Sequence, residues 1–405
     1  MTIIQKQKNS PNKAKNVIML QTAANVNMLL NFGKNITDIS LDKGVELHIL
    51  YSKYQKNIIK DDLQSINAVF HKTTYKQEFS VTGLMNNAKS FIHIFWLLKK
   101  LKPDVVYTRG TFMGYIARPA ALLAGVKNIY HHQDDFFHRE ENIGKIKRFS
   151  SKKIDLLLSK ISTKLFFVSD TIVQEAYNIG INKNKCILVG HDLHPIFKNN
   201  INFEIKRKHQ LIERYIKKAE NLFIVGSIAR IEDFKGIDTI IKVARQIKKI
   251  EKSIKFFIRG NGTKFEKYAE IIKSEQLTET VYLVNDYLPS DDMPSLFKSF
   301  DIFFLPTRRE GFGMVFAEAM SMGVSVICPK IHPVIEVVPN HLGWLIDPED
   351  IEAYSNSILE IFNDPKKAKK KSLQAKRYAL KRWGGASSGE KVVSTMLENT
   401  KLKDS

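Results

Sequence analysis

Short apolar runs alternate along the chain with segments whose apolar residues recur at helical spacing. Val45–Tyr51 and Asp104–Thr108 are strand-like, whereas the apolar residues of Lys89–Leu101 fall on one face of a helix. This alternation predicts parallel sheets covered by helices on both faces. The strands predicted in the first half are Val17–Gln21, Val45–Tyr51, Ala68–His71, Asp104–Thr108, Lys127–His131, Lys164–Val168 and Cys186–Val189, with a helix over Gly114–Leu123.

The pattern changes between His194 and Leu222, where the chain is polar and only a surface helix near Leu211–Ala219 is expected. A second α/β series follows. Its predicted strands are Leu222–Ile228, Lys255–Arg259, Val281–Leu283, Asp301–Pro306 and Val324–Cys328, with helices over Gly236–Ile250 and Ser387–Leu397. We therefore predict two Rossmann-like domains, at residues 1–198 and 199–384, and a C-terminal helical segment at 385–405.

Composition limits the class of protein. A chain of 405 residues with 43% apolar residues can form two cores and is not wholly disordered. No apolar run approaches the length of a membrane span, and the polar N-terminus lacks the apolar stretch of a secretory signal. Cys186 and Cys328 show neither a disulfide framework nor metal-ligand spacing. We expect a cytoplasmic protein.

The net charge of +21 suits anionic partners such as lipid headgroups or phosphorylated substrates, although a lysine-rich solvated surface would give the same value. Gly144–Lys164 holds seven basic residues against one acid, and its apolar residues are spaced for an amphipathic helix. The pattern fits a helix lying on an anionic bilayer, and it also fits a helix packed on the sheet. The candidates for membrane or acceptor contact are Lys147, Arg148, Lys152 and Lys153.

The strongest chemical signal is Glu310–Glu318, in which two glutamates are separated by seven residues directly after a predicted strand. Gly311 and Gly313 allow the backbone to approach a ligand closely. The helix predicted over Met314–Met322 would direct its free N–H groups at the same place, which suits a diphosphate. The two carboxylates would then reach different parts of one ligand. An ordinary strand–turn–helix with two surface acids would show the same residues.

A second signal is Gly226–Gly236, which follows the first predicted strand of the second half and opens a helix. Arg230 and Lys235 lie in this loop, at the carboxyl end of the strand, where open α/β sheets bind ligands. Two cations there could neutralise a departing diphosphate. They could also be two solvated side chains in a basic protein.

Taken together, the two motifs resemble those of the GT-B glycosyltransferases of family 4, which are retaining and metal-independent. Asp301–Thr307, Ser325–Pro329 and Gly343–Pro348 resemble segments around the family's motif, and Asp104–Gly125 and Phe167–Gly190 resemble its N-terminal domain. The resemblance covers most of the chain. It implies two Rossmann-like domains facing a central cleft, with a C-terminal helix crossing back to the N-terminal domain.

The resemblance also implies roles for the motif residues. Arg230 and Lys235 match the family's diphosphate contacts. Glu310 matches the acid nearest the hydroxyls of the donor sugar, where it acts by positioning and electrostatics. Glu318 matches the acid that binds the ribose hydroxyls.

Four further residues match donor contacts of the family. Phe312, Gly313 and Met314 match the backbone that lines the sugar. Asp286 lies in the segment that contacts the base, largely through backbone atoms. We expect no metal and no cofactor beyond the nucleotide sugar.

The sequence departs from the family where a histidine often touches the donor sugar. By distance from Gly125, Asp134 holds that position and His132 lies two residues before it. His132 and Asp134 therefore join Glu310 as catalytic candidates, and the choice among His131, His132 and Asp134 stays open.

Two other segments also differ from the family. The loop Thr22–Val26 lacks the usual glycine pair, and after Cys328 only Glu336 fits a Gly-Gly-x-x-Glu pattern. The sequence therefore assigns no specific contact between the loop Thr22–Val26 and the donor phosphate.

The function implied is transfer of a sugar, with retention, from a UDP- or GDP-linked donor to a saccharide or lipid-linked acceptor in bacterial surface polysaccharide or glycolipid assembly. The protein could work peripherally at the cytoplasmic face of the membrane. The alternatives are another GT-B enzyme, such as a sugar-nucleotide epimerase, or a non-catalytic basic binding protein. Aromatic residues are not interleaved with the basic ones, so we expect no nucleic-acid partner.

Overall fold

A computed structural model describes residues 15–21, 45–52, 68–74, 81–140, 143–199, 210–217, 219–385 and 387–401. The polar N-terminal residues 1–14 and the loop Thr22–Val26 lie outside this part of the chain. The chain divides into two compact units. Unit 1 consists of Met1–Phe167, Val173–Val189 and Ser388–Ser405, and unit 2 consists of Val168–Ile172 and Gly190–Ser387.

Unit 1 contains a seven-stranded parallel sheet in the order β3-β2-β1-β4-β5-β6-β7. Its strands are β1 (Lys15–Gln21), β2 (Val45–Ser52), β3 (Val69–Thr73), β4 (Val105–Arg109), β5 (Asn128–Gln133), β6 (Lys164–Phe167) and β7 (Cys186–Leu188). All seven predicted strands are present, with ends shifted by one or two residues. β5 extends to Gln133, two residues beyond its predicted end.

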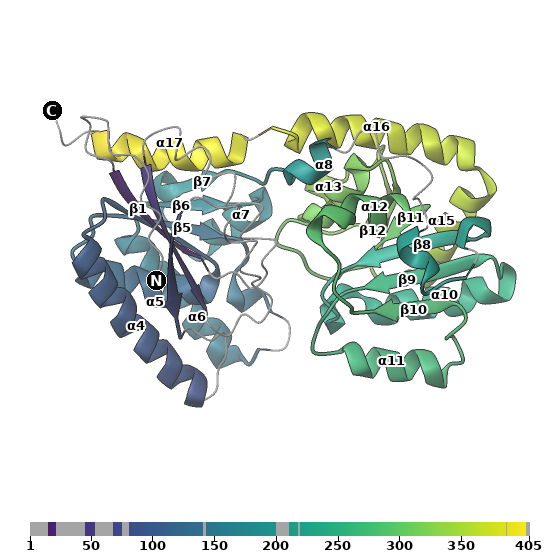
Figure 1. Ribbon diagram of the computed structural model, residues 1–405, viewed down its shortest axis with the longest axis horizontal. Coiled ribbons are helices and arrows are strands. Elements are labelled where there is room, and N and C mark those ends of the chain that lie inside the picture. Colours follow the sequence, from purple (N-terminus) through teal and green to yellow (C-terminus); the bar gives the residue numbers. More distant parts are fainter. Residues whose placement is uncertain are drawn as a thin grey trace. The chain divides into compact units, whose positions relative to one another are not determined.

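Helices cover both faces of this sheet (Figure 1). On one face, α4 (Val81–Leu101) and α5 (Thr111–Leu123) bury Ile94, Leu98 and Met113 against β2, β4 and β5. On the other face, α17 (Ser387–Lys401) buries Val392, Val393 and Met396. The C-terminal helix therefore belongs to the core of unit 1. The other helices of this unit are α6 (Lys145–Ile161), the 3₁₀ turns η2 (Phe137–Arg139) and η3 (Lys183–Lys185), and most of α7 (Asp170–Asn178).

Unit 2 contains a six-stranded parallel sheet in the order β10-β9-β8-β11-β12-β13, which is the doubly wound Rossmann order. Its strands are β8 (Phe223–Ile228), β9 (Ile254–Arg259), β10 (Val281–Val284), β11 (Ile302–Phe304), β12 (Ser325–Pro329) and β13 (Trp344–Ile346). The first five were predicted from the apolar pattern, and β13 was not. The helices are α8 (Pro195–Asn199), α9 (Gln210–Glu213), α10 (Ile237–Ile250), α11 (Phe265–Ser274), α12 (Met293–Lys298), α13 (Met314–Ser321), α14 (Val334–Val337), α15 (Ile351–Asn363) and α16 (Pro365–Trp383), with 3₁₀ turns η5 (Ala219–Asn221), η6 (Asp233–Lys235) and η7 (Ser290–Asp292).

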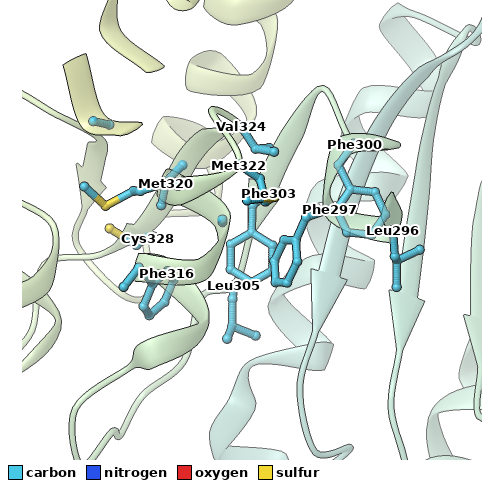
Figure 2. Packing of buried hydrophobic residues seen from close by; sticks show 14 of the residues in the cluster. Leu296, Phe297, Phe300, Phe303, Leu305, Phe316, Met320, Met322, Val324 and Cys328 are labelled. Atoms are coloured by element: carbon cyan, nitrogen blue, oxygen red, sulfur yellow. The ribbon is translucent and has the colours of Figure 1, made fainter. Parts of the chain in front are cut away.

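Successive residues of β11 point to opposite faces of the sheet and so to two cores. Phe303 packs with Phe297 and Phe316 at ring-centroid distances of 5.5 and 5.8 Å (Figure 2). Phe304 lies in the opposite core, 5.0 Å from Tyr354. Because both faces are covered, these strands are almost continuously apolar, as the pattern predicted.

The helix predicted over Leu211–Ala219 is wrong in length, because α9 ends at Glu213. Tertiary contacts end it: Arg214 and Tyr215 both bind the Asp286 carboxylate, and Ile216 is buried in the core. Among the described residues, no helix is long and apolar enough to cross a membrane.

The close approach of Gly226 in β8 to Phe300, just after α12, yields a stability prediction. A Cβ atom on Gly226 would lie 2.2 Å from the buried Phe300 ring, so Gly226→Ala should destabilise unit 2 by about 1–3 kcal/mol. Chemical denaturation measures this loss. Adding Phe300→Leu should restore part of it, and Gly385→Ala, whose Cβ has room, is the control. Unchanged stability of Gly226→Ala would contradict the packing.

Candidate active site

The candidate site of unit 2 begins where the η6 turn meets the loop after β11. The backbone N–H of Arg308 and the hydroxyl of Thr307 both donate to the carbonyl of Phe234, at 2.8 and 3.1 Å. Gly236 adopts φ +73°, and a Cβ atom there would lie 2.0 Å from the Pro306 carbonyl oxygen. Only glycine permits this approach, which holds two segments about 70 residues apart in sequence against each other.

Arg308 fixes the loop from the other side. Its guanidinium donates to both carboxylate oxygens of Asp238 at 2.8 Å and to Glu349 at 3.0 Å. It also donates to the Asp233 carbonyl at 2.9 Å. Burial raises the pKa of Asp238, but the hydrogen bonds from Arg308 outweigh burial and keep the pKa below its ordinary value. The loop that carries Glu310 is thereby tied to α10 and to η6.

This junction brings Lys235 and Glu310 together. The Lys235 Nζ donates to Glu310 Oε1 in a close ion pair, and each side chain is 11% exposed. Because both groups are largely removed from water, their attraction is stronger than that of a surface pair. The resemblance assigned the two residues to different parts of a donor, and here they bind each other.

Three cations surround the ring of Phe234. The guanidinium carbon atoms of Arg230 and Arg309 lie 5.5 and 4.9 Å from its centroid, and Lys235 Nζ lies at 5.3 Å. Cations at these distances are attracted to the ring face. Arg309 was not among the residues predicted from the sequence, where its only signal is its place next to Glu310.

The loop Gly311–Gly313 leads into α13. Gly313, with φ +96°, precedes the helix, and no side chain caps the helix N-terminus. The Ser169 hydroxyl donates to the Gly311 carbonyl at 3.0 Å, and the Phe312 ring packs edge to face on His191 at 5.2 Å. Met314 is the first residue of the helix. The Phe316 N–H donates to the Gly313 carbonyl at 3.0 Å, so the N–H groups available to an anion are those of Met314 and Val315.

Glu318 lies in α13, one turn beyond Met314. Its carboxylate is half-buried, and within the described part of the chain no side chain or backbone group hydrogen-bonds to it. Burial raises the pKa of Glu318 to about 7. An unpartnered carboxylate of this kind can accept hydrogen bonds from ligand hydroxyls.

Asp286, in contrast, is occupied within the fold. Its carboxylate accepts hydrogen bonds from Arg259 at 2.6 Å and from the Tyr215 hydroxyl, and it forms an ion pair with Arg214 at 2.7 Å. Burial raises the pKa of Asp286, but these hydrogen bonds outweigh it and lower the pKa overall. Its side chain therefore orders the loop after β10.

In unit 1, the three residues left open in the sequence have different surroundings. His131 and His132 are both buried within β5. His131 contacts Thr108 and Gln133, and its pKa lies well below the ordinary value because of burial. His132 bonds the Tyr107 hydroxyl at 2.7 Å. The role of His132 as a donor-sugar contact stays a prediction.

Asp134 follows β5 and is partly exposed. Its carboxylate accepts two hydrogen bonds from the buried guanidinium of Arg109, at 2.7 and 3.0 Å. A rigid bidentate pair of this kind orients the carboxylate. Of the three residues, Asp134 alone presents a charged group at the carboxyl end of the strand.

The basic segment of unit 1 forms α6, as its spacing predicted. The residues of its first turns, 144–150, are all exposed, and Ile146, Phe149 and Leu157 are 86%, 64% and 59% exposed. Lys147, Arg148 and Lys153 are exposed among them. Lys152 is different, because it lies 3.8 Å from Glu175 in an ion pair.

Glu336 has a structural role. It accepts from the backbone N–H groups of Asp170 and Thr171, at 3.0 and 3.1 Å, and so caps the first turn of α7. A carboxylate at a helix N-terminus is favourable for the helix dipole. Thr171, whose hydroxyl also donates to Glu336, was not singled out from the sequence.

The raised pKa of Glu318 leads to a test of its environment. The folded state binds this proton more tightly than the unfolded chain, so stability is lost as pH rises from about 4.5 through about 7. Glu318→Gln should therefore raise the stability by up to about 3 kcal/mol above pH 7 and leave it unchanged below pH 4.5. Thermal melting across pH measures the difference, with the exposed Glu270→Gln as control. A variant that is no more stable than wild type at high pH would refute this environment.

Comparison with known proteins places these features in a family context. Residues 209–379 match the family model described as glycosyl transferases group 1. This segment contains Arg230, Lys235, Glu310 and Glu318. The match thus includes both motifs of unit 2.

Two curated relatives cover most of the chain. One is UDP-Gal:alpha-D-GlcNAc-diphosphoundecaprenol alpha-1,3-galactosyltransferase from Escherichia coli, 27% identical over 70% of this chain and 72% of the relative. The other is the capsular polysaccharide biosynthesis glycosyltransferase CapM from Staphylococcus aureus, 24% identical over 80% of this chain and 82% of the relative.

Among solved structures, Anabaena HepE in complex with UDP-glucose superposes with a TM-score of 0.78 at 15% identity, over 95% of this chain and 99% of that one. This likeness confirms the predicted α/β architecture of the GT-B type. The matched segment, the relatives and the fold together identify this chain as a GT-B glycosyltransferase whose residues 209–379 match the group 1 glycosyl transferase family.

Proposed function

We propose that this enzyme transfers a sugar from a UDP- or GDP-linked donor, with retention, to a saccharide or lipid-linked saccharide in the assembly of a bacterial surface polysaccharide or glycolipid. The names of the two curated relatives, one acting on a diphosphoundecaprenol substrate and one in capsule synthesis, support this substrate class. The motifs resembling family 4 support retention.

The observation that carries the proposal is the Lys235–Glu310 pair beside the uncapped end of α13. A donor diphosphate would compete for the Lys235 ammonium and release the Glu310 carboxylate. Glu310 would then accept hydrogen bonds from hydroxyls of the donor sugar. One binding event would thus place the phosphate on the cation and the sugar beside the acid.

At such a site, transfer depends on stabilising the negative charge that develops on the leaving diphosphate. The bond from the anomeric carbon to the diphosphate oxygen breaks, and a bond from that carbon to the acceptor oxygen forms on the same face. The acceptor proton passes to the departing phosphate. Arg230, Lys235 and the N–H groups of α13 stabilise the developing negative charge. We propose that no metal is needed and assign no protein nucleophile.

Glu318 completes the donor site in this proposal. Its unpartnered carboxylate accepts from the ribose hydroxyls of the nucleotide. The Asn285–Tyr287 segment, ordered by the Asp286 contacts, supplies backbone groups to the base.

The acceptor and the membrane are assigned to unit 1. The projecting first turns of α6 offer apolar side chains flanked by Lys147, Arg148 and Lys153, the arrangement of a helix that enters the headgroup region of an anionic bilayer. We propose that the enzyme works at the cytoplasmic face of the membrane, where a lipid-linked acceptor would be available.

The donor site is tested by separating nucleotide binding from transfer. Glu310→Gln should lower kcat/KM by about 10²-fold or more yet bind UDP or GDP at least as tightly as wild type, because Lys235 is no longer paired. Lys235→Gln should lose both. Thermal shift measures binding, and transfer from a UDP or GDP sugar, with and without a chelator, measures catalysis.

The exposed Lys249→Gln is the control and should retain both properties. Absence of a thermal shift of the wild type with any nucleotide would count against the donor site. Wild-type transfer by Lys235→Gln would count against its role, and loss of transfer with a chelator would contradict metal independence.

The membrane assignment predicts a second phenotype. The double change Phe149→Ser and Leu157→Ser should reduce cosedimentation with phosphatidylglycerol vesicles, including the part that survives high salt, because apolar burial is not screened. Ile250→Ser, an equally exposed apolar residue on α10, is the control. Wild-type cosedimentation of the double variant would remove α6 from the proposal.

A further inference from the structure

Helix α16, at the C-terminal end of unit 2, has an unusual distribution of charge. Its 19 residues, Pro365–Trp383, include nine lysines and arginines and no acid. The donor site uses none of them. The helix runs along the outside of unit 2, beside α13 (Figure 1).

One face of α16 holds it firmly in the fold. This face is made of small residues and one tryptophan, and it packs into the two cores of the unit. Its buried residues are Ala368, Ser372, Ala375, Ala379 and Trp383. The opposite face is therefore presented by a rigid helix, not by a mobile tail.

Four basic residues form a straight row on that outer face. Lys366, Lys370, Arg377 and Lys381 are separated by four, seven and four positions, so they lie within about 60° of one another around the helix and span about 22 Å. All four are exposed. Within the described residues, none of the four forms an ion pair.

Two other lysines of α16, unlike the outer row, have partners within unit 2. Lys367 donates to Glu360 at 2.8 Å, and Lys371 lies 4.1 Å from the centroid of Trp344. These two side chains are satisfied within unit 2. In the outer row, the positive charges of residues four positions apart repel each other, and an external anion would relieve that repulsion.

We propose that the outer face of α16 docks on an anionic bilayer through charge alone. A straight row of four cations matches a flat anionic surface, and clusters of four to eight basic residues on one helix are typical of binding to acidic lipids. Leu373 and Gln374 lie among them. The aromatic residues of α16, Tyr378 and Trp383, pack against each other at the core, so the row itself offers no ring for the base stacking that single-stranded nucleic acids use. The lipid chemistry is that assigned to α6, but the contact is in unit 2 and does not depend on the transfer reaction.

The test is vesicle binding by the full chain. The quadruple change Lys366→Gln, Lys370→Gln, Arg377→Gln and Lys381→Gln keeps residues of good helix propensity. It should weaken binding to phosphatidylglycerol vesicles about tenfold or more at low salt and have little effect at high salt, where exposed charges are screened. Neither protein should bind neutral phosphatidylcholine vesicles through this face.

A matched variant carries the same charge change elsewhere on unit 2, at the exposed residues Lys217, Lys249, Lys252 and Lys273. It should bind anionic vesicles like wild type, which would show that the row and not the net charge matters. Equal losses in the two variants, or none in the α16 variant, would overturn the inference. So would loss of duplex DNA binding with unchanged vesicle binding.

Nucleotide thermal shift and sugar transfer, measured on the same proteins, report the donor site separately. The α16 variant should keep the nucleotide shift, which also verifies that unit 2 is folded. Failure of the nucleotide shift in the wild type would count against the proposed function, and it would leave the vesicle result standing.

Discussion

The candidate site depends on one backbone junction, at which the Phe234 carbonyl accepts hydrogen bonds from Arg308 and Thr307. Glycine at position 236 allows Pro306 to come this close. The junction holds Lys235 against Glu310, and Arg308 supports it through Asp238 and Glu349. Lys235 and Glu310, the candidate binding residues, are thus positioned by backbone contacts and by the Arg308 guanidinium. Loss of this positioning would weaken electrostatic stabilisation, because the charged groups act only when they are already in place.

The polar residues that the sequence singled out have two different environments. Asp286 and His132 are used within the fold, by Arg259 and Tyr107 among others. Glu318 has no partner among the described residues, and its raised pKa reflects burial without compensation. Protonation relieves the cost of burying this carboxylate, and in the proposed donor site a ligand that donates to it would do the same. This contrast in hydrogen bonding, more than residue type, separates Glu318 from Asp286.

The basic residues also differ in their surroundings. The α6 helix combines cations with exposed apolar side chains, whereas the outer row of α16 is almost purely charged. The two surfaces therefore predict different dependence on salt for the same membrane. A net charge of +21 is too coarse to separate them, because it counts Lys367 and Lys371, which are engaged within unit 2, with Lys366 and Lys370, which are not.

Much of this protein could be predicted from the sequence alone. Alternation of apolar runs predicted the parallel sheets, since strands buried on both faces must be apolar, and the spacing of Glu310 and Glu318 with Arg230 and Lys235 pointed to the family. What the sequence could not decide were contacts between distant segments. The end of α9 at Glu213, the burial of His132, the ion pair of Lys235 with Glu310 and the position of Arg309 over Phe234 all depend on residues far apart in the chain. Local pattern determines which segments form strands and helices, but only tertiary packing determines which polar groups are paired and which remain for a ligand.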